Sequence, residues 1–138
     1  MFVRKILKVN IADKSSELDV LFDTGSSLTL MCKNVLMDKF KDVKIKLLKY
    51  PRKTYTLNGT SLIVDSYVDG EIEIGGQVLE ERIYVSKDFV KEVMLDGKII
   101  KFPDLIVGVS TMEAWNIELD LKRGEVILKG AAVLFKMF

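Results

Sequence analysis

Apolar and polar residues alternate along most of this chain, which is the pattern of strands that bury one face. Helical spacing is confined to three short stretches, at 33–40, 87–95 and 110–115, the last with Ser110 as its expected N-cap. The alternation predicts strands over residues 2–11, 17–22, 28–32, 43–47, 71–74, 77–85, 98–102, 104–109, 117–120 and 125–128. Many short strands and few helices indicate a mostly-β fold, either a closed barrel or a folded sheet.

Glycine and proline divide these segments. Asn58-Gly59 lies between two arms rich in threonine and branched residues, and it predicts a hairpin because both residues accept a positive φ. Pro51 is expected to break the strand before it. Further turns are predicted at Asp69-Gly70, Gly75-Gly76 and Asp96-Gly97.

Length and composition limit the classes of function. The chain has 138 residues, enough for one domain over 1–138 with a sizeable core, and 49% of them are hydrophobic. A net charge of +1 gives no bulk attraction to nucleic acid or to anionic membranes. The absence of histidine excludes Ser-His and Cys-His catalysis and most zinc sites. We expect no metal and no cofactor.

Cys32 is the single cysteine, so no disulfide forms within the chain, and we expect a buried structural thiol. Charges interrupt residues 1–5 too often for a signal peptide, and the longest uncharged run, 54–64, is too short to span a bilayer. These features predict a protein of the cytoplasm with no membrane partner.

The sharpest chemical signal is the stretch from Val20 to Leu30. An apolar strand ends at Asp23, the small residues of Thr24-Gly25-Ser26-Ser27 follow, and a second apolar strand begins. A carboxylate at the end of an apolar strand is costly unless it is satisfied or used. This arrangement predicts a strand that delivers an acid to a tight loop.

In this order and spacing, the chain resembles the retropepsin-like aspartic peptidases over nearly its whole length. The resemblance is carried by Asp23-Thr24-Gly25-Ser26, by the hairpin at Asn58-Gly59, and by Ile106-Val107-Gly108 before a short helix. It implies an acid-protease-like closed β-barrel or folded sheet that forms half of a two-fold dimer. It also implies hydrolysis of peptide bonds by water activated between two aspartates.

Only one Asp-Thr-Gly is present, so the second acid is expected to be Asp23 of another copy. By the resemblance, Thr24 and Gly25 hold the active-site loop. Ser26 is expected to donate to the outer oxygen of Asp23, which would favour an acid-shifted optimum.

The remaining assignments have alternatives. Asn58-Gly59 is either a flap tip or an ordinary surface hairpin, and Tyr55 either lines the cleft or packs on a neighbouring strand. Leu28, Leu57 and Ile106 are either walls of the cleft, together with Gly108, or ordinary core residues.

Two positions depart from the family pattern. Ser27 and Val109 stand where retroviral members commonly carry an acid and an arginine that pair near the dimer interface. The alternative functions are therefore a peptide-binding or dimerisation module with little turnover, and a structural β domain with a fortuitous motif.

Overall fold

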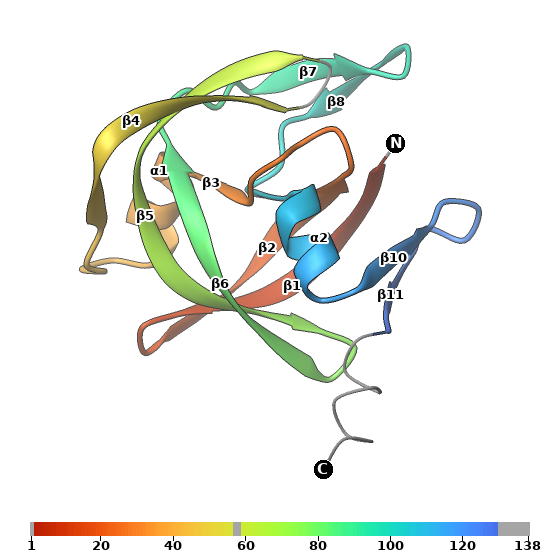
Figure 1. Cartoon of the computed structure of the whole chain (residues 1–138), viewed down its shortest axis with the longest axis horizontal. Helices are drawn as coiled ribbons and strands as arrows, with labels where there is room; N and C mark the ends of the chain where they lie inside the picture. Colours follow the sequence, from red (N-terminus) through yellow and green to blue (C-terminus); the bar gives the residue numbers. More distant parts are fainter. Residues whose placement is uncertain (1, 57–58, 130–138) are drawn as a thin grey trace.

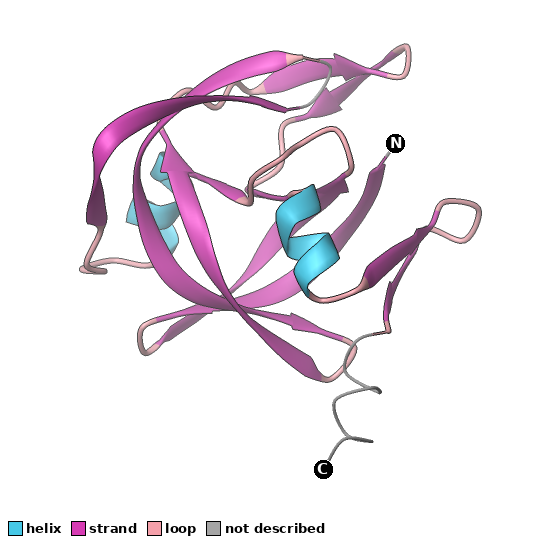
Figure 2. Ribbon diagram, in the orientation of Figure 1, coloured by secondary structure: helices cyan, strands magenta, loops and turns pink. Residues whose placement is uncertain are grey.

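The fold is a single large sheet with two small hairpins and two short helices (Figures 1 and 2). The computed structural model describes residues 2–56 and 59–129. In chain order its elements are β1 (Phe2–Ile11), β2 (Lys14–Asp23), β3 (Leu30–Cys32), α1 (Lys33–Lys39), β4 (Lys46–Thr56), β5 (Thr60–Ile74), β6 (Gln77–Ser86), β7 (Glu92–Leu95), β8 (Lys98–Lys101), β9 (Leu105–Val107), α2 (Val109–Ala114), β10 (Ile117–Asp120) and β11 (Glu125–Leu128). The prediction of a mostly-β fold is confirmed.

The main sheet closes on itself. Its strands follow the order β1-β2-β9-β3-β6-β5-β4, and β1 also pairs with β5, from Val9 opposite Ile72 to Ile11 opposite Gly70. Strand β9 lies between β2, which runs parallel to it, and β3, which runs antiparallel. A strand in this position is covered on both faces, which explains why Leu105, Ile106 and Val107 are all buried and apolar.

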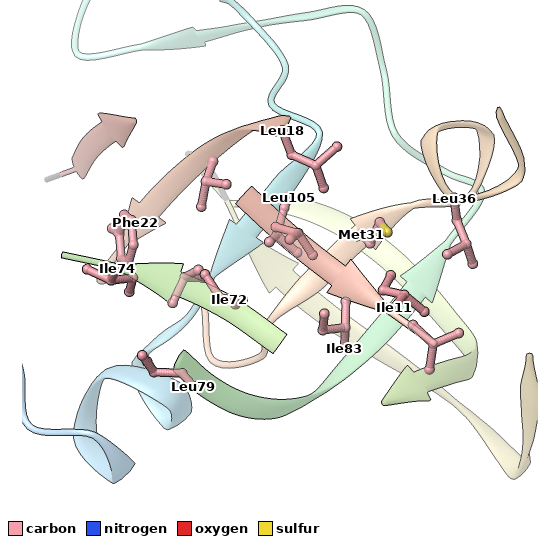
Figure 3. Close-up of a cluster of buried hydrophobic side chains, with 14 of the residues drawn as sticks. Ile11, Leu18, Phe22, Met31, Leu36, Ile72, Ile74, Leu79, Ile83 and Leu105 are labelled. Atoms are coloured by element: carbon pink, nitrogen blue, oxygen red, sulfur yellow. The ribbon is translucent and has the colours of Figure 1, made fainter. Parts of the chain in front are cut away.

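The first hydrophobic cluster fills the interior of the closed sheet (Figure 3). Phe22, Leu18 and Val20 enter it from β2, and Leu105 and Val107 enter from β9. Each fully buried side chain of this size stabilises the fold by about 1.5–3 kcal/mol relative to an exposed one. The labelled side chains in Figure 3 come from β1, β2, β3, α1, β5, β6 and β9, so this cluster joins segments distant in the sequence.

The second cluster lies on the opposite face of the same central strands. Its buried members are Leu21, Leu30, Leu62, Val64, Leu95, Phe102 and Ile106. Alternation along β2 places Leu21 here while its neighbours Val20 and Phe22 lie in the first cluster. The second cluster thus packs the β4–β5 hairpin and the β7–β8 hairpin against the central strands.

Three local predictions were wrong. Strand β4 continues through Pro51, with its register shifted between Leu47 and Arg52, because a bulge accommodates the missing N–H. Asp69-Gly70 lies within β5 and not in a turn. Residues 87–95 form an irregular segment followed by β7, and not a helix, because Leu95 and partly buried Phe89 and Val93 pack on the second cluster.

Both remaining helices and the last hairpin, β10–β11, are confirmed. The N-cap of α2 is Gly108 and not Ser110, whose side chain is exposed. Cys32 is only partly buried, contrary to our expectation, because β3 ends there and the chain turns into α1. Within the described residues, no helix is long and apolar enough to cross a membrane.

Gly70 is explained by close packing between strands. A methyl group on its Cα would lie 2.8 Å from Cδ1 of Ile83 and 3.2 Å from the carbonyl oxygen of Asn10. The glycine therefore allows β1 to approach β5 and close the sheet.

We predict that Gly70→Ala lowers the free energy of unfolding by about 1–3 kcal/mol through overpacking. Ile83→Val removes the nearest atom and alone should cost about 0.5–1.5 kcal/mol. Urea denaturation of the double variant should show less loss than the sum of the two single losses. Strictly additive losses would contradict this explanation of Gly70.

Candidate functional site

Asp23 is the last residue of β2, and it is 4% exposed. The N–H of Gly25 donates to Oδ1 of Asp23 at 3.0 Å, and the N–H of Ser26 donates to the main-chain carbonyl of Asp23 at 3.1 Å. A tight turn therefore follows the acid, and its backbone satisfies part of the carboxylate. This meets the condition under which a carboxyl group is tolerated at a buried position.

The side chain of Ser26 supports the loop and does not donate to the carboxylate of Asp23. Its side chain is fully buried, and its hydroxyl donates to the carbonyl of Leu28 at 3.0 Å. A hydroxyl has one proton to donate. The hydrogen bond from the Ser26 hydroxyl to Asp23 that we expected from the sequence is therefore not formed. The expectation of an acid-shifted pH optimum, which depended on this bond, loses its support.

The loop after Asp23 rests on the start of α2. The N–H of Val109 donates to the carbonyl of Ser26 at 2.8 Å, and the N–H of Ser110 donates to the carbonyl of Ser27 at 3.2 Å. These bonds use N–H groups of the first helical turn, which have no partner within the helix. The loop and the helix are thereby fixed to each other.

Gly108 makes this contact possible. A methyl group on its Cα would lie 2.8 Å from the carbonyl oxygen of Ser26 and closer still to that of Leu28. Both obstacles are backbone atoms, so they cannot rotate away as a side chain would. The predicted cleft residue Gly108 is therefore a packing residue beneath the loop that follows Asp23.

Two threonines reinforce the same junction. The hydroxyls of Thr29 and Thr111 are 2.5 Å apart, and the N–H of Gly108 donates to Oγ1 of Thr29 at 3.2 Å. Both threonines are 2% exposed. Our sequence analysis missed them because the two residues are far apart in the chain and belong to no recognisable motif.

An ion pair fixes β2 upstream of the acid. Nε of Arg4 donates to Oδ1 of Asp19 at 2.8 Å, and the Arg4 guanidinium also donates to Oδ2 and to the carbonyl of Lys101. Hydrogen bonding to Asp19 raises the pKa of Arg4 above its ordinary value, against the opposing effect of burial. The N–H of Asp19 in turn donates to Oδ2 of Asp104 at 3.0 Å. These contacts tie β1, β2 and the approach to β9 together.

The β4–β5 hairpin arches above the loop that follows β2 (Figure 1). Thr54 and Thr56 lie on its buried face, and the hydroxyl of Thr54 is 3.3 Å from that of Ser27. Oγ1 of Thr56 has no hydrogen-bond partner within the part of the chain that the structure describes. Leaving a buried hydroxyl unpaired costs roughly 1–3 kcal/mol.

The other residues predicted for the hairpin are placed differently. Tyr55 lies on the outer face, where it is 56% exposed beside Lys53, so the structure does not bring it toward Asp23. Gly59 is exposed with a φ of +76°, which suits the turn, and Leu57 and Asn58 lie outside the described residues. The alternation of Thr54, Tyr55 and Thr56 was visible in the sequence, but its phase relative to the loop was not.

The two apolar candidates for the cleft wall belong to the second cluster. Ile106 is fully buried there, and Leu28 is half-buried at its margin. Ile106 therefore presents no surface to a ligand in this conformation, whereas Leu28 lies at the border between loop and core.

An apolar groove of about 480 Å³ adjoins the loop that follows Asp23. Thr24 forms one side of it, and residues of α2 and β10 form the other, with Leu121 at 42% exposure. A second pocket, of about 500 Å³, is polar and is lined by Asn10, Glu81 and neighbouring residues, none of which we predicted as site residues. Among the described residues, no three His, Cys, Asp or Glu side chains are grouped so as to hold a metal ion.

Comparisons with known proteins bear on the fold. A scan against protein-family models and a search of curated proteins find no match. The retroviral protease-like domain of Ddi1 from Leishmania major is 13% identical, with a TM-score of 0.54 over 94% of this chain and 89% of that domain. The chain therefore has the retropepsin-like fold that its motifs predicted, and identity this low shows the fold alone.

Two further solved structures match with TM-scores below 0.5. EIAV protease complexed with the inhibitor HBY-793 is 20% identical, with a TM-score of 0.47 over 86% of this chain and 93% of that one. Lpg0085 from Legionella pneumophila, a protein of unknown function, is 13% identical, with a TM-score of 0.44 over 80% and 85%.

We predict that Gly108→Ala lowers the free energy of unfolding by about 3 kcal/mol, at the upper end of the usual range for overpacking, because backbone carbonyls block the new methyl group. Ser110→Ala is the matched control, two residues away. It should change stability by less than about 0.5 kcal/mol, since Ser110 is exposed and is not the N-cap. A costly Ser110→Ala together with a harmless Gly108→Ala would contradict the described junction.

Proposed function

We propose that this protein is an aspartic endopeptidase that works as a homodimer. The observation that carries the proposal is the buried carboxylate of Asp23, held by the N–H of Gly25 on a loop that is itself fixed to α2. A catalytic acid has to be presented in one geometry, and a loop anchored by backbone hydrogen bonds and close packing provides this.

The reaction needs two carboxylates close together, which cannot both ionise and therefore share one proton. The ionised Asp23 takes a proton from a bound water, whose oxygen attacks the carbonyl carbon of the peptide bond. The protonated Asp23 of the second copy hydrogen-bonds to the carbonyl oxygen and supplies its proton, so that a neutral gem-diol forms. The first Asp23 then returns the water's proton to the amide nitrogen as the C–N bond breaks, and the second Asp23 takes back a hydroxyl proton, which leaves an amine and a carboxylic acid. No covalent intermediate, metal or cofactor takes part. Thr24, Gly25 and Ser26 hold the loop in place.

The second acid comes from a second copy of the chain, since the motif occurs once. The groove between Thr24, α2 and β10 supports this, because it places exposed apolar surface directly beside the loop that carries Asp23. Among the described residues, β10 and β11 pair only with each other, and isolated two-stranded sheets are marginal. We propose that a two-fold axis near Thr24 covers this groove with the partner's equivalent surface.

An extended peptide is the substrate class that this arrangement fits. The β4–β5 hairpin, with Tyr55, Leu57, Asn58 and Gly59 near its tip, would act as a flap that closes over the peptide and excludes water. Leu28 would line the cleft at the base of the loop, above Ile106 and Gly108.

We predict that Asp23→Asn abolishes cleavage of α-casein, an unfolded substrate, with a loss of about 100-fold or more across acid to neutral pH. Asp13→Asn is the matched control, because Asp13 is an exposed turn residue. It should retain the wild-type rate. Wild-type activity in the Asp23→Asn variant would exclude Asp23 as the catalyst, whereas peptide binding without cleavage by the wild type would favour the binding-module alternative.

A second prediction concerns the dimer. Leu121→Glu adds a charge to the apolar groove, and burying that charge against a partner should weaken dimerisation at least about tenfold in sedimentation equilibrium. Leu47→Glu makes the same change at an 81% exposed position on β4 that does not line the groove, and it should leave dimerisation unchanged. Equal behaviour of the two variants would place the interface elsewhere.

A further inference from the structure

Thr56 is a buried polar side chain without an explanation in the fold. It is 1% exposed, and its Oγ1 is the one fully buried side-chain oxygen or nitrogen among the described residues that makes no hydrogen bond. Buried hydroxyls nearly always make a hydrogen bond. An exception therefore suggests a hydrogen-bond partner on a ligand that is absent from the free chain.

The position of Thr56 indicates where that partner binds. Thr54 precedes it by two residues and so shares its face of β4. The hydroxyl of Thr54 is 3.3 Å from that of Ser27, in the loop that follows Asp23. Cross-strand pairing adds Leu62 opposite Thr54 and Thr60 opposite Thr56 to the same face, while Tyr55 lies on the other. Thr56 is therefore two residues nearer the hairpin tip than Thr54, whose hydroxyl already contacts the active-site loop.

We propose that the Thr56 hydroxyl is a positioning group that hydrogen-bonds to the main chain of a peptide bound between the hairpin and the active-site loop. This inference rests on the proposed function. A threonine hydroxyl both donates and accepts, so it serves either a peptide carbonyl or a peptide N–H, and it reads the backbone and not the side chains of the substrate.

Because the Thr56 hydroxyl is unpaired within the described part of the free chain, its hydrogen bond to a peptide should contribute more binding free energy than such a bond usually does. Most hydroxyls exchange water for a ligand, and the net gain is small. Thr56 is already buried without a hydrogen bond among the described residues, so the peptide satisfies a hydroxyl that has no partner there.

The test compares Thr56→Val, Thr56→Ser and Thr54→Val with wild type. Valine has nearly the same shape as threonine, so Thr56→Val should leave the urea midpoint unchanged or raise it, while KM for α-casein rises about tenfold and kcat stays constant. Thr56→Ser keeps the hydroxyl and should restore KM. Thr54→Val loses the contact with Ser27 and should lower the urea midpoint.

The outcomes separate this inference from the function on which it rests. Wild-type cleavage with an unchanged KM in Thr56→Val would overturn the role of Thr56 and leave the peptidase intact. A lower urea midpoint for Thr56→Val would also overturn it, because the hydroxyl would then have an internal partner. Absence of both cleavage and casein binding in the wild type would overturn the proposed function, and with it this inference.

Discussion

The contact between Gly108 and the carbonyls of the loop after Asp23 is the constraint on which the candidate site depends. Strand β9 lies between β2 and β3, so the chain that leaves β2 has to pass the end of β9 to reach β3. That end is Gly108, and only a residue without a side chain leaves room for the carbonyls of Ser26 and Leu28. The strand order thus brings the loop that carries Asp23 onto Gly108, and the missing side chain at Gly108 lets the loop pack there.

Burial on both faces of the central strands gives this arrangement its rigidity. The first cluster fills the closed sheet, and the second joins the same strands to the two hairpins above them. Asp23 ends a strand that is supported from both sides, and Arg4 and Asp104 fix its middle through Asp19. The β4–β5 hairpin contributes Leu62 and Val64 to the second cluster, so its stem is anchored, whereas Thr54 and Thr56 nearer its tip make few polar contacts.

Much of this fold was predictable from the sequence, and the exceptions have physical reasons. Strands rich in apolar and branched residues, such as 2–11, and the signal of an acid, a loop and a strand at Asp23 are local features, and they were predicted correctly. The prediction of a turn at Asp69-Gly70 was wrong because Gly70 is needed for close packing between strands. In the sequence alone, such a glycine cannot be distinguished from one that is needed for a turn. The prediction of a helix over 87–95 was wrong because the apolar residues of this segment pack on a cluster assembled from distant strands, which the local sequence does not show.

The residues of the candidate site could be proposed from the motif, but the contacts that support them could not. The motif identifies Asp23 and its loop, and the fold places Gly108 beneath them. The hydroxyls of Thr29, Thr111, Thr54 and Thr56 could not be assigned, since each depends on which residue faces it across the fold. Ser26 shows the same limit, because its buried hydroxyl had two possible acceptors and the loop geometry selects the carbonyl of Leu28.

The claim that two copies of Asp23 form one site is tested most directly by the dependence of activity on protein concentration. If each site needs two chains, the rate of casein cleavage per chain should rise in proportion to concentration below the dimer dissociation constant and level off above it. Parallel sedimentation would show monomers in the first range and dimers in the second. A rate per chain that stays constant where the protein sediments as a monomer would contradict the two-chain site.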